Sequence, residues 1–198
     1  MFCPRILIYK GNRKAGLKFM KILAIDSSGL VASVAVIEDD NLVAEYTMNH
    51  KKTHSQTLVP MLDEIRKMTD LDLSTIDAIA VAAGPGSFTG LRIGSATAKG
   101  LGLALNKPII PVPTVDALAY NLYGFDKIIC PIMDARRDQV YTGLYVFNMN
   151  ENGTYSMETL KEQCAMDIAE LAQLVDTFEQ DVIFLGDGVA VYEEKIRN

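Results

Sequence analysis

Residues 26–29 (Asp26-Ser27-Ser28-Gly29) combine a carboxylate with the backbone N–H groups of a tight turn. This combination could hold a metal–phosphate group, because successive backbone N–H groups in a turn form an anion-binding concavity. The alternative is that the Asp26 side chain closes the turn by accepting a backbone hydrogen bond, as aspartate often does. The pattern alone leaves both interpretations open.

Residues 84–94 form a second candidate phosphate loop, with Gly84, Gly86 and Ser87 ahead of an expected helix. Glycine-rich turns before a helix N-terminus present N–H donors to anions. The spacing matches neither a Walker A loop nor a Rossmann fingerprint. Ser87 or Thr89 could instead cap the helix without any ligand.

Small residues recur every four positions in the helix that this loop opens, at Gly90, Gly94, Ala98 and Gly102. Each glycine inside a helix costs up to about 1 kcal/mol relative to alanine. The repetition therefore predicts close packing of another backbone on this stripe. The neighbour could be the chain's own sheet or another subunit.

The two histidines, His50 and His54, are four residues apart but do not match a known metal motif. Lys51 stands where a zincin motif carries glutamate, and the sequence has no third histidine. We therefore predict no metal site and no catalytic residue, with both histidines at the surface or in a capping role.

The mixed charges of residues 134–138 are expected at a turn between two strands. Such residues are usually solvated, although they could form an ion-pair cluster at a domain interface or contact a partner. No nucleophile elbow of the G-x-S-x-G type is present.

Hydrophobic periodicity predicts the elements that position these residues. In the first half we expect strands and helices in the order β-β-β-α-β-α-β-α of a ribonuclease-H-like domain, at residues 21–26, 30–38, 42–48, 55–68, 77–83, 90–105, 109–111 and 114–122, with Thr114 as a helix cap. In the second half we expect strands at 127–133, 139–147 and 181–185, a helix at 167–176, and a final helical segment after Gly186-Asp187-Gly188.

Three parts follow from this pattern: a leader or upstream-start extension (1–19), an N-terminal lobe (20–123) and a second lobe (124–198) that we expect to be incomplete at its C-terminus. Mixed sheets with flanking helices define an α/β protein.

Of the 19 basic residues five lie in 1–19, so residues 20–198 carry 14 bases and 25 acids, a net charge of −11. Such an acidic chain is a poor stand-alone binder of the phosphate backbone of nucleic acids. The three cysteines lack disulfide or zinc spacing and no apolar run could span a bilayer, so we expect a cytoplasmic protein.

Several stretches together resemble the TsaB (YeaZ) family of tRNA threonylcarbamoyladenosine biosynthesis proteins, over nearly all of residues 20–198. They are residues 25–28 (IDSS), 54–60 (HSQTLVP), 84–94 (GPGSFTGLRIG), 113–118 (PTVDAL) and 134–141 (DARRDQVY).

This resemblance implies an actin-like (ASKHA) fold in two lobes and a non-catalytic scaffold that acts on the TsaD catalytic subunit. It implies contact with TsaD, or with a second copy as a homodimer, through Leu58, Met61, Leu62, Ile65, Gly90, Leu91, Gly94 and Ala98. It also implies that the TsaE ATPase joins, that tRNA is bound only indirectly, and that any nucleotide sits at an interface with partners. Residues 113–118, the counterpart of the stretch that carries the metal-binding histidines of TsaD, contain no histidine.

A competing hypothesis is an ATPase or small-molecule kinase of the actin-like superfamily, which would use Asp26 and Gly186-Asp187-Gly188 on phosphates. Under the scaffold hypothesis, Asp26, Ser27, Ser28, Gly84, Gly86 and Ser87 are a vestigial phosphate loop.

Overall fold

The computed structural model describes residues 20–50 and 53–197. The predicted extension 1–19 lies outside these residues. The chain divides into two compact units, one ending at Val112 and the other beginning at Pro113. None of the described helices combines the length and hydrophobicity that crossing a lipid bilayer requires.

Unit 1 is built on a five-stranded sheet in the order β3-β2-β1-β4-β5. Its elements are β1 (Lys21–Asp26), β2 (Ala32–Glu38), β3 (Asn41–Met48), α1 (His54–Met68), η1 (Leu73–Thr75), β4 (Ala78–Gly84), α2 (Phe88–Leu105) and β5 (Ile109–Pro113). β1 pairs antiparallel with β2 and parallel with β4. This is the ribonuclease-H-like order that the sequence predicts.

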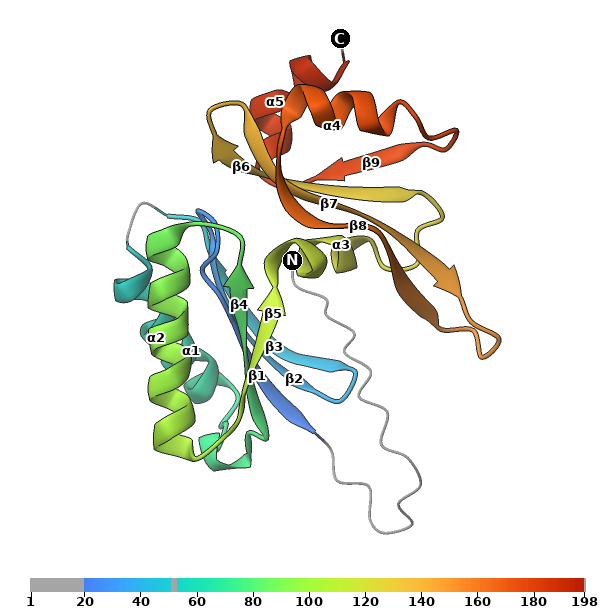
Figure 1. Cartoon of the computed structure of the whole chain (residues 1–198). Helices are drawn as coiled ribbons and strands as arrows, with labels where there is room; N and C mark the ends of the chain where they lie inside the picture. The colour runs from blue at the N-terminus through green and yellow to red at the C-terminus, as the bar shows by residue number, and fades with distance from the viewer. Residues whose placement is uncertain (1–19, 51–52, 198) are drawn as a thin grey trace. The chain divides into compact units, whose positions relative to one another are not determined.

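Both long helices of unit 1 lie on one face of this sheet (Figure 1). The apolar face of α1 meets the side chains of Leu23, Val34, Val36 and Ile79 in one buried cluster. Burying a side chain of this size contributes about 1.5–3 kcal/mol. The core of unit 1 therefore lies between the helices and the sheet.

Unit 2 repeats the first four strand positions, in the order β8-β7-β6-β9. Its elements are α3 (Thr114–Ala119), η2 (Tyr120–Leu122), β6 (Ile128–Arg136), β7 (Gln139–Met149), β8 (Tyr155–Asp167), α4 (Ile168–Val175), β9 (Val182–Leu185) and α5 (Gly188–Arg197). Like β1, β6 pairs antiparallel with the next strand and parallel with the strand after a helix. Alternate residues of β6 pack into two clusters, one with α4 and α5 and the other with α3.

The unit boundary differs from the predicted boundary after Tyr123, because α3 packs in unit 2. Val115 and Ala119 are fully buried with Ile129 and Phe147. In addition, the Tyr145 hydroxyl donates a 2.6 Å hydrogen bond to Asp116 Oδ1. Residues 113–122 are therefore the first elements of unit 2.

Two local predictions also need correction. Thr114 is the first residue of α3 and not its cap, since the cap position is Pro113. β8 has no counterpart among the predicted elements, because this strand lies at the sheet edge and its residues are exposed or only half-buried. An edge strand without a buried face lacks the period-2 hydrophobic signal.

Cys130 lies in β6, is fully buried, and shares a 3.4 Å hydrogen bond with the Thr142 hydroxyl. Burial raises the pKa of the Cys130 thiol from its ordinary value of 9.0 to about 12, and the Thr142 contact lowers it slightly. A pKa raised in the folded state gives a stabilising contribution that is present below pH 9.0 and is lost as the pH rises toward 12.

We therefore expect Cys130 to resist thiol reagents in the folded protein. In the double variant Cys3→Ser/Cys164→Ser, labelling by an aromatic disulfide at pH 8 should be at least about 100-fold slower in buffer than in denaturant. A variant that keeps only the half-buried Cys164 is the control and should react faster. Rapid labelling of Cys130 in buffer would contradict the burial described for β6.

Candidate functional site

The turn after β1 is closed by its own side chains. Asp26 Oδ1 accepts a 2.8 Å hydrogen bond from the backbone N–H of Ser28. Ser27 and Ser28 are 2% and 3% exposed. One oxygen of the carboxylate that could have faced a metal–phosphate group is therefore used within the turn, as in the Asx-turn alternative.

The glycine-rich loop after β4 packs directly on this turn. The Ser87 N–H donates a 2.6 Å hydrogen bond to the Ser28 carbonyl oxygen, and Ser27 Oγ donates a 2.9 Å hydrogen bond to the Gly90 carbonyl oxygen. A Cβ atom at Gly86 would overlap the Ser28 carbonyl, and one at Gly90 would overlap the Ser27 carbonyl. Both glycines are required because two backbones touch here.

Two backbone N–H groups in the first turn of α2 also have partners within the chain. Ser87 is the N-cap, and its Oγ accepts a 3.2 Å hydrogen bond from the Gly90 N–H. The Leu91 N–H donates to the Ser87 carbonyl oxygen at 2.8 Å. The structure thus brings together the six predicted phosphate-loop residues, but donors that an anion would need at Ser28, Ser87 and Gly90 already have protein partners.

His54 connects the start of α1 to the same turn. Its Nε2 lies 3.0 Å from the Gly29 carbonyl oxygen, and because a carbonyl only accepts, Nε2 is the donor. Within residues 20–50 and 53–197, no group of three His, Cys, Asp or Glu side chains is arranged to hold a metal ion. The role of His54 is therefore to fix the turn, which its sequence spacing from His50 did not indicate.

Unit 2 contains the same arrangement at the end of β6. Asp134 Oδ1 accepts from the Arg136 N–H at 2.8 Å, the same two-residue spacing as in Asp26 and Ser28. Gly186 and Gly188 sit against the Ile132 carbonyl oxygen, where a side chain would overlap. The glycine-containing turn after β9 is therefore packed on the backbone of β6.

Three of the charged residues in 134–138 form ion pairs, namely Asp134, Arg136 and Asp138. The Arg136 guanidinium lies 3.1 Å from Asp134 Oδ2, and Lys195 of α5 lies 2.6 Å from Asp138 Oδ1. The Tyr192 hydroxyl donates to Asp134 Oδ1 at 2.9 Å. These contacts hold the β6–β7 hairpin against α5, so they form an ion-pair cluster within unit 2.

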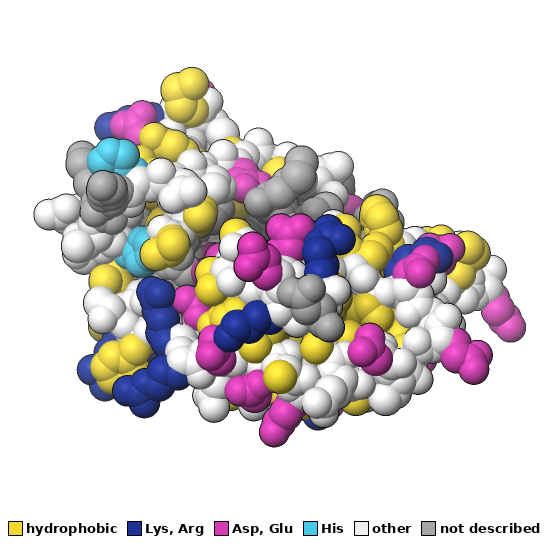
Figure 2. Space-filling model, turned by 90° about the horizontal axis from the view of Figure 1, so that it is seen from above, with side chains coloured by type: hydrophobic (Ala, Val, Ile, Leu, Met, Phe, Trp, Pro, Cys, Tyr) yellow, Lys and Arg dark blue, Asp and Glu magenta, His cyan; other side chains and the backbone are white. Residues whose placement is uncertain are grey.

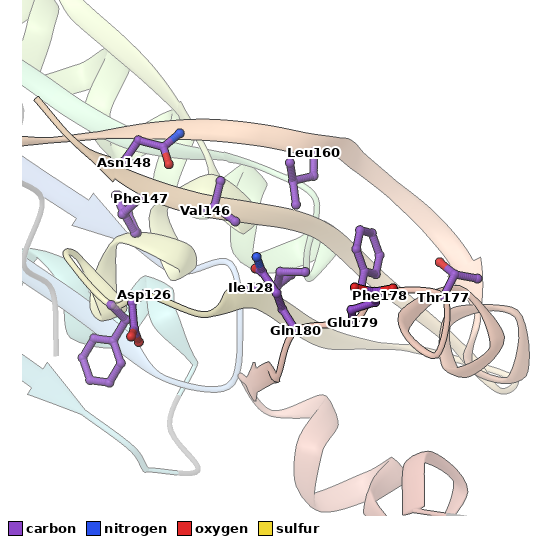
Figure 3. Close-up of a pocket in the computed structure, with 11 residues that line it drawn as sticks. Asp126, Ile128, Val146, Phe147, Asn148, Leu160, Thr177, Phe178, Glu179 and Gln180 are labelled. Carbon is purple, nitrogen blue, oxygen red and sulfur yellow. The ribbon is translucent and has the colours of Figure 1, made fainter.

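A hollow of about 610 Å³ lies within unit 2 (Figure 3), on residues of β6, β7, β8 and the loop between α4 and β9. Its lining includes the apolar side chains of Phe147, Leu160 and Phe178. The charged residues in it, Asp126 and Glu179, are both acidic. An apolar and acidic hollow is unsuited to phosphate groups.

The predicted partner interface needs correction, because its residues pack inside unit 1. Leu58 and Met61 are 1% exposed and Ala98 is 0% exposed. The whole predicted set consists of core or half-buried positions: Leu58, Met61, Leu62, Ile65, Gly90, Leu91, Gly94 and Ala98. The small-residue stripe serves packing within the unit, with Ser27 and Val81 next to Gly94 and with Ile109 next to Gly102.

The opposite side of α2 is exposed, and the sequence-based prediction of a partner interface did not include it. We call it the outer stripe and define it as Phe88, Arg92, Ala96, Lys99 and Leu103, which share one helical face. Phe88 is 69% exposed and Leu103 is 87% exposed. A helix with apolar residues on both its buried and its exposed side is the sequence signal that could have revealed this surface.

Comparison with known proteins agrees with this architecture. Residues 41–197 match the family model described as TsaD, tRNA N6-adenosine threonylcarbamoyltransferase. The tRNA threonylcarbamoyladenosine biosynthesis protein TsaB of Bacillus subtilis is 37% identical over 90% of this chain and 76% of its own length. The chain belongs to the TsaB family.

Other members of the TsaB family are similar over comparable lengths. TsaB of Haemophilus influenzae is 29% identical over 88% of this chain and 75% of its own length. The solved structure of YeaZ from Pseudomonas aeruginosa superposes with a TM-score of 0.76 at 29% identity, covering 89% of this chain and 80% of that one. These matches confirm the predicted family and the actin-like α/β fold.

The glycines of this TsaB-family chain allow a matched test of the loop contact. Gly90→Ala should lower the free energy of unfolding by about 2 kcal/mol or more, because the new methyl group meets backbone that cannot rotate away. Gly100→Ala in the same helix meets nothing within 4 Å and should raise it by up to about 1 kcal/mol. Urea unfolding followed by far-ultraviolet circular dichroism measures both, and similar values for the two variants would contradict the contact.

Proposed function

We propose that this chain is a non-catalytic scaffold and activator subunit in tRNA threonylcarbamoyladenosine biosynthesis. It would pair with a TsaD-type catalytic subunit, which transfers the threonylcarbamoyl group to the tRNA adenosine next to the anticodon. The observation that carries the proposal is the closed glycine-rich loop. Where a phosphate-binding relative needs free N–H donors, this TsaB-family chain uses those donors to hold its own turn.

The proposed contact with the TsaD-type subunit is the outer stripe of α2. The side chains of Phe88 and Leu103 expose apolar surface to water, which is unfavourable and typical of an interaction site. Aromatic and arginine side chains are also enriched among the residues that contribute most of the binding energy at protein interfaces. Arg92 lies 3.9 Å from the centre of the Phe88 ring, so an aromatic and a cation are presented together. Burial of this stripe by a partner helix would remove the exposed apolar area.

The charge of the chain bears on how the assembly would hold tRNA. Acidic side chains are spread over the face seen in Figure 2, and basic side chains gather in fewer places. A protein with this negative net charge would hold tRNA only indirectly, through its partners. We propose that a TsaE-type ATPase joins the pair, that nucleotide binds only where subunits meet, and that the protein works in the cytoplasm.

Light scattering on a sizing column tests the proposal. The chain mixed with the TsaD-type subunit of the same organism should form a one-to-one complex. Leu103→Asp should weaken it at least about tenfold, because a carboxylate would be buried in an apolar contact. Val191→Asp in α5, which replaces a valine that is 57% exposed, is the matched control and should leave the complex unchanged.

Two outcomes would count against this proposal. Absence of any complex with the unmutated chain would contradict the scaffold function itself. A complex that tolerates Leu103→Asp would move the contact away from the outer stripe. Substitutions at Leu62 do not serve this test. The Leu62 side chain is 5% exposed, so its replacement would change the stability of the fold and not only the binding of a partner.

Nucleotide titration distinguishes the scaffold from an actin-like ATPase or small-molecule kinase. By calorimetry, the isolated chain should bind Mg-ATP no more tightly than about 1 mM, since the loop donors are already engaged. Micromolar binding that is lost in Asp26→Asn would favour the ATPase or kinase instead. Nucleotide bound only by the assembled subunits would agree with a shared site.

A further inference from the structure

The hollow of unit 2 combines apolar side chains with exposed carboxylates (Figure 3). Ile128, Val146 and Phe178 also belong to the buried cluster that contains residues of α4 and α5, so this part of the lining is continuous with the core. Phe125 and Leu160 are 49% and 42% exposed, although both are large apolar side chains. A concave, mostly apolar surface of about 610 Å³ has the size of a small-molecule site.

Two hydrogen bonds hold walls of the hollow in place. The Phe178 N–H donates to the Val175 carbonyl oxygen at 3.1 Å, which ties the loop that carries Glu179 to the end of α4. Between the two long strands, Asn148 Nδ2 donates a 2.6 Å hydrogen bond to Glu158 Oε2. A site whose walls are already ordered loses little conformational entropy when a ligand binds.

The charged side chains that line the hollow are all acidic. They are Asp126 and Glu179, and no lysine, arginine or histidine is among the described residues of the lining. Neither carboxylate forms an ion pair with a described residue, and the neighbouring Lys127 is paired with Asp181 at 3.0 Å. The hollow therefore offers negative charge beside apolar surface.

We propose that this hollow binds a small organic cation, an amine or guanidinium group carried on an apolar body. The apolar body would cover Phe125 and Leu160 and remove their exposed surface from water. The cation would lie beside Asp126 or Glu179, which appear on either side of Ile128 in Figure 3. An aromatic ring close to a cation adds a further attraction. An anion would be repelled by the same carboxylates.

Titration with three matched probes tests the inference. Near neutral pH, phenylbutylamine is a cation, phenylbutanol is its neutral counterpart and phenylbutanoate is its anionic counterpart. At low salt the amine should bind the full chain with a Kd of about 1 mM, at least about fourfold tighter than the alcohol and tenfold tighter than the acid. Backbone NMR shifts should change mainly at Leu160 and residues 177–180.

Removing the two carboxylates should remove the preference for the cation. With Asp126→Asn and Glu179→Gln together, the amine and the alcohol should bind within about twofold of each other, while the affinity for the alcohol stays the same. The matched control combines Glu151→Gln and Glu170→Gln, which remove the same charge from exposed positions of unit 2 outside the hollow. This control should keep the preference for the amine.

Replacing an exposed apolar wall should weaken both ligands. Leu160→Gln should lower the affinity for the amine and for the alcohol at least about threefold, because apolar contact is lost. Val191→Gln on α5 replaces a side chain that is 57% exposed and lies outside the hollow, so it should change neither affinity.

Three results would overturn the inference. The first is that the amine causes no saturable shift at the hollow up to about 20 mM, and the second is that the alcohol or the acid binds as tightly as the amine. The third is that the amine binds but tolerates Leu160→Gln, which would place it elsewhere on the acidic surface. Because the hollow lies in unit 2 and the proposed contact on α2 lies in unit 1, each of these results leaves the proposed function standing.

Discussion

The contact between the first turn of α2 and the carbonyl groups of Ser27 and Ser28 determines how unit 1 is organised. It joins the end of β1 to the start of α2 through backbone atoms, with no side chain between them at Gly86 and Gly90. A contact this close needs every polar group around it to be paired, because an unpaired buried donor or acceptor costs about 1–3 kcal/mol. Asp26, Ser87 and His54 supply partners for the turn and the loop. The result is a rigid junction from which α2 projects its outer stripe.

Unit 2 reaches a similar solution with different side chains. The hydrogen bond from the Arg136 N–H to Asp134 repeats that from Ser28 to Asp26. A glycine also meets backbone in both units, but Gly86 lies against Ser28 after β1, whereas Gly186 lies against Ile132 within β6. The similarity lies in strand order and backbone contact, not in residue identity. Strand order and backbone contacts of this kind can stay the same while the side chains change, because they depend on main-chain geometry. The same order of paired strands is therefore compatible with different side chains in the turns that follow β1 and β6.

The fold was largely predictable from the sequence because its core strands and helices have clear periodicity. β1, β3 and α1 begin within one residue of their expected positions. β8 was not predictable, since an exposed edge strand carries no alternating apolar pattern. The six loop residues were correctly grouped, but whether their N–H groups face solvent or the chain itself depends on contacts between residues far apart in sequence. For the same reason the apolar face of α1 was assigned to a partner when it belongs to the unit's own core.

The hydrogen bond from Ser27 to Gly90 also has a kinetic meaning. This hydrogen bond joins two residues that are 63 positions apart in the sequence, so it can form only when the chain between them has been brought together. Closing a loop of that length costs conformational entropy that local helix formation cannot offset, and contacts between distant residues slow folding. α2 can form hydrogen bonds along its own length early, whereas its first turn reaches its final position only when it meets the turn after β1. We therefore expect the Phe88 end of the outer stripe to become native late in the folding of unit 1.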